Sequence, residues 1–135
     1  MKYLLDVNVL LALGLFDHEF HQPVARWVSA LCATEATLAS CSLTELGFVR
    51  VLAQSPQYAF NVAEARNLLR RLKATSPVKF EFVADDHGAS NLPSWVRAPK
   101  QVSDGHLAQL AKAKGAEFVT LDRGIPGALM IPQGR

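Results

Sequence analysis

Four acidic residues occupy positions where a carboxylate can do chemistry. Asp6 lies inside the apolar run MKYLLDVNVLLALGLF, Glu45 in SLTELGFVRVL, Asp104 in QVSDGHLAQ, and Asp122 ends FVTLD. A carboxylate in an apolar segment is costly to bury unless it is paired or binds a cation. Carboxylates that meet at one place also repel each other unless a cation lies between them. Mg²⁺ and Mn²⁺ prefer such oxygen ligands, so these acids together predict a divalent metal site.

Each acid also has a purely structural explanation. Ser42 to Glu45 has the spacing of a capping box. Ser103 can cap a helix whose N-terminal dipole favours Asp104. Asp122 can belong to a turn, and Asp6 can cap the helix after the first strand. Capping acids are common, so only the convergence of all four acids at one place favours the metal site.

Strands alternating with helices must position these acids. The expected strands are residues 2–7, 34–40, 79–85 and 116–122, with a short last strand in GALMIP. The expected helices are residues 9–16 after an Asn8 cap, 24–33, 42–54, 61–74 and 103–115. This alternation predicts an α/β fold, a three-layer α/β/α sandwich with a mainly parallel central sheet.

Such a sheet would gather the four acids at one edge, because sites in this class lie outside the carboxyl ends of the strands. Asp6 and Asp122 come at the ends of expected strands, and Asp104 and Glu45 lie in the first turns of expected helices. Glu45 also shares a helical face with Val49, a face that should be largely buried.

The composition is that of a globular protein. The chain has 135 residues, 50% hydrophobic and 19% charged, and we expect a single domain over residues 1–135. Fourteen basic and 12 acidic residues give a formal charge of +2, which permits nucleic-acid binding without indicating it. Cys32 and Cys41 form no CxxC motif, so we expect two buried, reduced thiols.

The apolar N-terminal stretch is neither a signal peptide nor a membrane span by its pattern. Asp6 and Asn8 interrupt it, no clear cleavage site follows, and it is shorter than the roughly 20 apolar residues that cross a bilayer. We therefore expect a cytoplasmic protein without a membrane partner.

The stretches LLDVNVLLAL, SLTELGFVRVL, QVSDGHLAQLAKAKG and FVTLDRG, in this order over the chain, resemble a PIN domain, specifically the VapC-type toxins of bacterial toxin–antitoxin systems. The resemblance implies a metal-dependent endoribonuclease with a PIN-like sandwich fold. It maps the family's acidic quartet onto the four acids above, with Asn8 and Thr120 as supporting residues. Gly105 departs mildly from the pattern, because a helix former is more usual there.

The implied chemistry uses Mg²⁺ or Mn²⁺ to activate a water and to neutralise charge on the phosphate, so no side-chain nucleophile is needed. We expect Asp6, Asp104 and Asp122 to hold the metal directly or through water. Glu45 is expected either to bind the metal, directly or through water, or to orient the attacking water.

Other residues are candidates for contact with RNA. They are Arg123 beside Asp122, Arg50 on the helix of Glu45, and His18 and His21 in DHEFHQP. A zinc site at the two histidines lacks a third ligand. The helix with Arg66, Arg70, Arg71 and Lys73 has either a solvated basic face or a surface for RNA or an acidic partner.

Alternative functions remain at this point. One is a catalytically silent PIN-like module that binds RNA or protein. Another is a phosphotransfer or phosphatase domain, which would need a second acid where Asn8 stands or a lysine at a later strand end, and FVTLDRG supplies no lysine. The toxin interpretation implies a cognate antitoxin, with Phe16, Phe20 and Trp27 as a candidate docking groove. The apolar helices at 9–16 and 24–33, together with the habit of the family, predict a homodimer.

Overall fold

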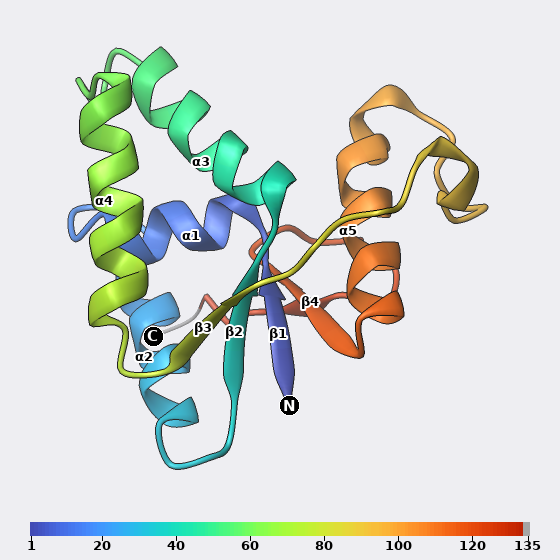
Figure 1. The fold of residues 1–135 in the computed structure, drawn as a ribbon, viewed down its shortest axis with the longest axis horizontal. Helices are drawn as coiled ribbons and strands as arrows, with labels where there is room; N and C mark the ends of the chain where they lie inside the picture. The colour runs from blue at the N-terminus through green and yellow to red at the C-terminus, as the bar shows by residue number, and fades with distance from the viewer. Residues whose placement is uncertain (134–135) are drawn as a thin grey trace.

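The computed structural model describes residues 1–133, and its centre is a five-stranded sheet in which every neighbouring pair is parallel (Figure 1). The strand order is β3-β2-β1-β4-β5. The strands are β1 (Lys2–Leu5), β2 (Thr37–Ser40), β3 (Lys79–Phe82), β4 (Ala116–Thr120) and β5 (Leu129–Met130). The helices are α1 (Val7–Gly14), α2 (His21–Leu31), α3 (Ser42–Gln54), α4 (Val62–Thr75) and α5 (Val102–Ala113), with 3₁₀ turns η1 (Ala89–Asn91) and η2 (Pro99–Gln101).

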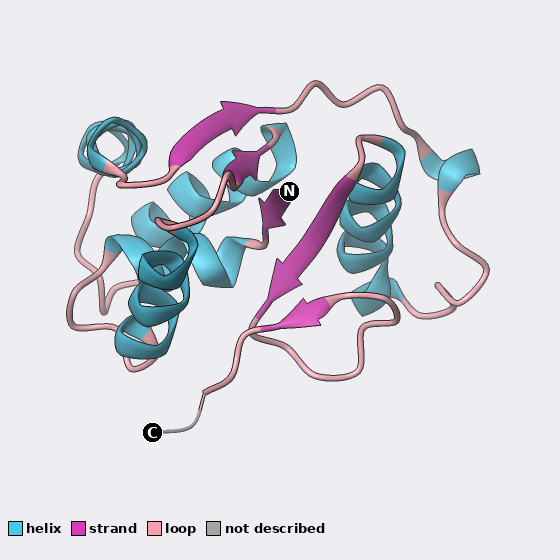
Figure 2. Ribbon diagram, turned by 90° about the horizontal axis from the view of Figure 1, so that it is seen from below, coloured by secondary structure: helices cyan, strands magenta, loops and turns pink. Residues whose placement is uncertain are grey.

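Helices cover both faces of the sheet, which confirms the predicted α/β/α sandwich. Figure 2 shows α5 on one side of the sheet and α1 to α4 on the other. Successive strand residues point to opposite faces, so each strand contributes to two separate cores. Leu5, Leu38 and Val119 belong to the core under α1 to α4, and Leu4, Ala39 and Phe118 belong to the core under α5.

The strand order creates a switch point beside β1. The chain runs from β1 to β2 and β3 on one side, and then returns to place β4 on the other side of β1. In open parallel sheets, ligands bind in the crevice outside the carboxyl ends of the strands at such a point. Leu5 of β1 pairs with Val119 of β4, so the residues after these two strands leave the sheet side by side.

The first helix begins two residues earlier than predicted, and its cap is different. The backbone N–H of Val7 donates to Asp6 Oδ1 at 2.8 Å, so Asp6 is the N-cap and the prediction of an Asn8 cap was wrong. An aspartate accepts this bond as readily as an asparagine. Asn8 lies inside α1, and its Oδ1 instead accepts from the backbone N–H of Leu121 at 3.3 Å.

Two other predicted caps were also wrong. Helix α3 has the predicted bounds, but its N-cap is Cys41, whose backbone N–H donates to Thr44 Oγ1 at 3.0 Å, so Ser42 to Glu45 is not a capping box. Helix α5 begins at Val102 after the 3₁₀ turn η2, so its N-cap is Gln101 and Ser103 lies within its first turn. At α4, Asn61, the first residue of the helix expected at 61–74, is the N-cap, and its Oδ1 accepts from the N–H of Glu64 at 2.7 Å.

Both cysteines are free thiols, as predicted. Cys41 is buried as expected, but Cys32 is exposed, so the prediction that both are buried was wrong for Cys32. Among residues 1–133, none of the helices has the length and apolar character needed to span a bilayer.

Candidate metal centre at the carboxyl edge of the sheet

Three of the four predicted acids converge at the switch point. Asp6, Asp104 and Asp122 each offer a carboxylate oxygen, and these oxygens all lie within 4.8 Å of one another. Asp6 follows β1, Asp104 lies in the first turn of α5, and Asp122 follows β4 by two residues. Asp6 is buried, Asp104 is half-buried and Asp122 is exposed, so the group forms one wall of an accessible site rather than part of the core.

Thr120 connects two of these acids. Its buried hydroxyl donates to Asp6 Oδ2 at 2.8 Å and accepts from the backbone N–H of Asp122 at 3.0 Å. Asp6 therefore has one oxygen fixed by Thr120 and the other by the helix cap at Val7. The bond between Asn8 and the backbone after β4 ties α1 to the same edge. Both supporting positions predicted from the sequence thus lie in the hydrogen-bond network around the acids.

Burial and neighbouring negative charge disfavour the charged forms of two of the three carboxylates, Asp6 and Asp104. Burial raises the pKa of Asp6 from 3.8 to about 6, although hydrogen bonds from Thr120 and Val7 oppose the rise, and the charges of Asp104 and Asp122 add to it. Burial, followed by the charge of Asp122, raises the pKa of Asp104 as well. A cation bound among these oxygens would therefore stabilise their charged forms. A hard divalent cation with a preference for carboxylate oxygens fits this donor set.

Glu45 lies outside the group of three. Its Oε2 accepts from Lys73 Nζ at 2.5 Å and from the hydroxyl of Ser40 at 2.6 Å, which neutralises it at the neighbouring strand end. The sequence predicts a solvated or partner-binding basic face for Lys73, and the pairing with Glu45 differs from both. The helical spacing of Lys73 from the buried Ala65 and Leu69 places it on the inner face of α4 and is the signal that could have revealed this pair.

Among the four candidate RNA contacts, Arg123 lies beside the acids and the two histidines do not. Arg123 lines the same cavity as Asp104 and Asp122. Arg50 is exposed on α3, and its role stays a prediction. His18 and His21 lie beyond the far end of α1, and the structure does not bring them to the acids.

His18 makes its bond within the connection between α1 and α2, whereas His21, the first residue of α2, bonds to α1. His18 Nδ1 accepts from the backbone N–H of Phe20 at 3.1 Å. His21 Nδ1 lies 2.8 Å from the carbonyl oxygen of Ala12, and because a carbonyl only accepts, the ring donates.

A family profile described as the PIN domain matches residues 3–127. This chain belongs to the PIN domain family. The assignment confirms the resemblance read from the four ordered stretches, and the matched region contains all three residues of the acidic group and Glu45.

Among curated proteins, this PIN domain is 40% identical over 137 residues to "Ribonuclease VapC44" of Mycobacterium tuberculosis, covering 95% of this chain and 94% of that protein. It is also 40% identical over 129 residues to "Ribonuclease VapC38" of the same species, covering 90% and 86%. Among solved structures, a chain of "VapBC2 from Rickettsia felis bound to a DNA fragment from their promoter" matches with a TM-score of 0.65 at 15% identity, over 96% of this chain and 97% of that chain.

Several of the apolar residues predicted to contact partners are buried or partly buried within the chain. In α1, Val9, Leu10, Leu11 and Ala12 are buried within the chain, so that helix offers little apolar surface for a dimer. Phe20 and Trp27 are partly buried against the main core, whereas Phe16 is exposed, and the docking groove at these residues stays a prediction. The exposed large apolar side chains include Leu46, Val62, Phe82 and Val102.

Proposed function

We propose that this PIN domain is a Mg²⁺- or Mn²⁺-dependent endoribonuclease that acts as the toxin of a toxin–antitoxin pair. The observation that carries the proposal is the group formed by Asp6, Asp104 and Asp122, whose oxygens lie within 4.8 Å of one another. The names of the two ribonuclease relatives, each similar over most of the chain, support RNA as the substrate.

In this mechanism Asp6, Asp104 and Asp122 hold the metal, directly or through water. When bound, the cation lowers the pKa of a coordinated water and neutralises charge that develops on the phosphate. Thr120 and the N–H of Val7 fix the orientation of Asp6, so the ligand is positioned before the metal arrives. Glu45, held outside the group by Lys73, is assigned the orientation of the attacking water, and Arg123 is assigned a contact with phosphate.

The proposal extends to partners and location. A cognate antitoxin would restrain the nuclease in the cytoplasm by placing a basic side chain among the carboxylates, where an arginine fork pairs with two oxygens at once. The structural neighbour, described as VapBC2 bound to a DNA fragment from the promoter, supports such a partner. A homodimer remains part of the proposal, with the exposed Leu46, Val62 and Val102 as the apolar surface available to it.

The test combines metal removal with one isosteric substitution. Purified protein should cleave RNA with Mg²⁺ or Mn²⁺ and lose cleavage in EDTA, and Asp104→Asn should abolish cleavage while the protein stays folded. Glu117→Gln is the matched control, because Glu117 lies in β4 near the opposite end of the sheet. Full cleavage in EDTA would contradict the metal mechanism, and a folded, fully active Asp104→Asn protein would contradict the assigned site.

A further inference from the structure

The acidic group shares a cavity with an aromatic ring and two cations. The cavity has a volume of about 360 Å³, which lies in the range of roughly 300–1,000 Å³ found for ligand pockets. Asp104 and Asp122 line it together with Trp95, Lys100 and Arg123. Trp95 is half-buried, while Lys100 and Arg123 are exposed. The mechanism above leaves Trp95 and Lys100 without a role.

Gly105 lets the segment that carries Trp95 pack against α5. A Cβ atom at Gly105 would lie 2.2 Å from Val96 Cγ2 and 3.4 Å from Pro93 Cδ. The segment carrying Trp95 therefore packs directly on the first turn of α5, one residue from Asp104. This contact explains why glycine stands where a helix former was expected.

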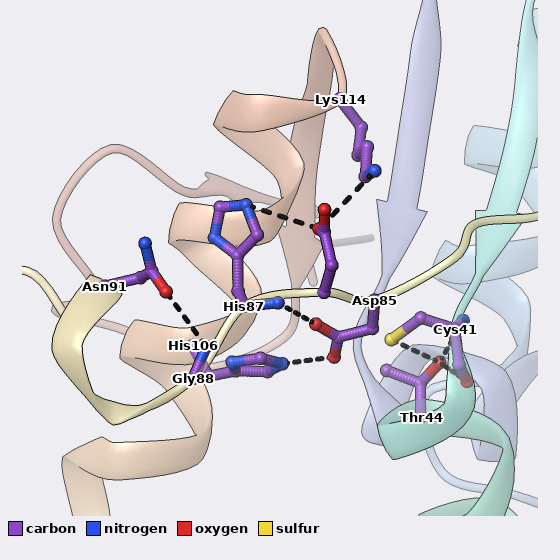
Figure 3. Close-up of polar contacts among 9 residues, drawn as sticks. Cys41, Thr44, Asp85, His87, Gly88, Asn91, His106 and Lys114 are labelled. Carbon is purple, nitrogen blue, oxygen red and sulfur yellow. Dashed lines mark hydrogen bonds and ion pairs between the residues drawn. The ribbon is translucent and has the colours of Figure 1, made fainter.

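The long connection between β3 and α5 is anchored near both ends. At its start, Asp85 accepts from the backbone N–H of His87 at 3.0 Å and from His106 Nε2 of α5 at 2.5 Å (Figure 3). At its end, Gln101 Oε1 accepts from the backbone N–H of Arg97 at 2.8 Å. Anchoring holds the segment in place before a ligand binds, which lowers the entropic cost of binding.

These features suit a single-stranded nucleic acid. Aromatic side chains stack on unpaired bases, and neighbouring cations follow the phosphates. Lys100 and Arg123 also offset the repulsion that Asp104 and Asp122 exert on a phosphate. A base inside a duplex is already stacked and paired, so its face is not available to an indole.

We propose that Trp95 stacks on an unpaired base of the RNA next to the metal centre, while Lys100 and Arg123 bind the adjoining phosphates. This inference rests on the proposed ribonuclease function and deepens it by naming two residues, Trp95 and Lys100, that bind the substrate beside the acids.

Fluorescence tests the stacking directly, because the chain has two tryptophans, Trp27 and Trp95. The variant Trp27→Phe leaves Trp95 as the reporter, and Asp6→Asn is added to stop cleavage in the presence of Mg²⁺. Binding of a short oligouridylate, which forms no duplex, should quench the emission of Trp95. The same oligomer with abasic residues should bind without the quench. In the matched variant Trp95→Phe, the remaining Trp27 should show no quench.

RNA-binding affinity, measured by anisotropy, distinguishes the contribution of the Trp95 ring from the contribution of the cations. Trp95→Ala should weaken binding about 5- to 150-fold without changing the slope of log K against log salt. Lys100→Gln should reduce that slope by about 0.7, the value for one phosphate contact to a single strand. Lys112→Gln, in the last turn of α5, should leave both affinity and slope unchanged.

The outcomes distinguish this inference from the function on which it rests. If the parent protein cleaves RNA but RNA binding leaves Trp95 emission unchanged, stacking is overturned and the nuclease stands. A folded Trp95→Ala protein with full affinity would likewise overturn stacking alone. If the parent neither binds nor cleaves RNA with Mg²⁺ or Mn²⁺, the function fails and the inference fails with it. If Trp95→Ala does not fold, fluorescence of the Trp27→Phe protein still tests whether Trp95 stacks on a base, because that protein retains Trp95.

Discussion

Without metal, the substitution Asp6→Asn should stabilise this protein at neutral pH. Asp6 is 7% exposed, and its pKa in the folded chain is raised from 3.8 to about 6, mainly by burial. At 1.36 kcal/mol per pKa unit, this difference corresponds to about 3 kcal/mol. The folded state holds the proton more tightly than the unfolded state, so the stability present below pH 3.8 is lost as the pH rises to about 6. The variant does not lose this stability, because an asparagine side chain does not ionise. Its Oδ1 can still accept from the N–H of Val7.

Thermal unfolding in EDTA measures this effect. At pH 8 the variant should melt roughly 10 °C above the parent, taking about 4 °C per kcal/mol for a chain of this size. The difference should shrink as the pH falls from about 6 towards 4, because Asp6 of the parent becomes protonated. Saturating Mn²⁺ should raise the melting temperature of the parent by mass action and leave that of the variant nearly unchanged. Asp17→Asn, at an exposed loop position, serves as the control.

The reasoning would be refuted by either of two results. One is a clear drop in melting temperature for Asp6→Asn at pH 8 in EDTA, which would mean that the charge of Asp6 is needed as a helix cap. The other is a difference between parent and variant that stays the same from pH 4 to pH 8.

Three further substitutions test the packing and the network around the site. Thr120→Val should lower Mn²⁺ affinity about 10- to 100-fold by calorimetry, because it removes the hydrogen bond that orients Asp6, a proposed metal ligand. Gly105→Ala should destabilise by about 1–3 kcal/mol in urea despite a better helix propensity, and Val96→Ala should restore most of the loss in the double mutant. Lys73→Met should lower the free energy of unfolding by about 1–3 kcal/mol. Adding Glu45→Gln should recover part of this loss, and additive losses would show that the two side chains do not interact.

The order of strands and helices could be predicted from the sequence, because each element carries its own apolar pattern. Helix α3 was predicted with its observed bounds, 42–54. The grouping of Asp6 with Asp122 also followed, since both come at the ends of strands, where the sites of a parallel sheet lie. Adjacency of β1 and β4 then brings them together.

Contacts between elements could not be predicted in the same way. The pairing of Glu45 with Lys73 joins α3 to α4, and which of several carboxylates a lysine meets depends on how two helices pack. Trp95 lies in a segment without periodicity, so no pattern indicated its direction. The cap of the first helix was predicted wrongly for a related reason. Asp6 and Asn8 are both good capping residues, and only the bond of Asn8 to the backbone after β4 decides between them.

The pairing of β1 with β4 also governs when the metal centre can exist during synthesis. Asp6 and Thr120, which share a hydrogen bond, are 114 positions apart, and contacts of such separation form late because a long loop must close first. A nascent chain that has emerged only as far as β3 carries Asp6 but neither Asp104 nor Asp122. Translation that stops before β4 therefore yields fragments that cannot assemble the centre. A ribosome making this chain would thus not be exposed to the proposed nuclease activity of the growing polypeptide until β4 has emerged and taken its place beside β1.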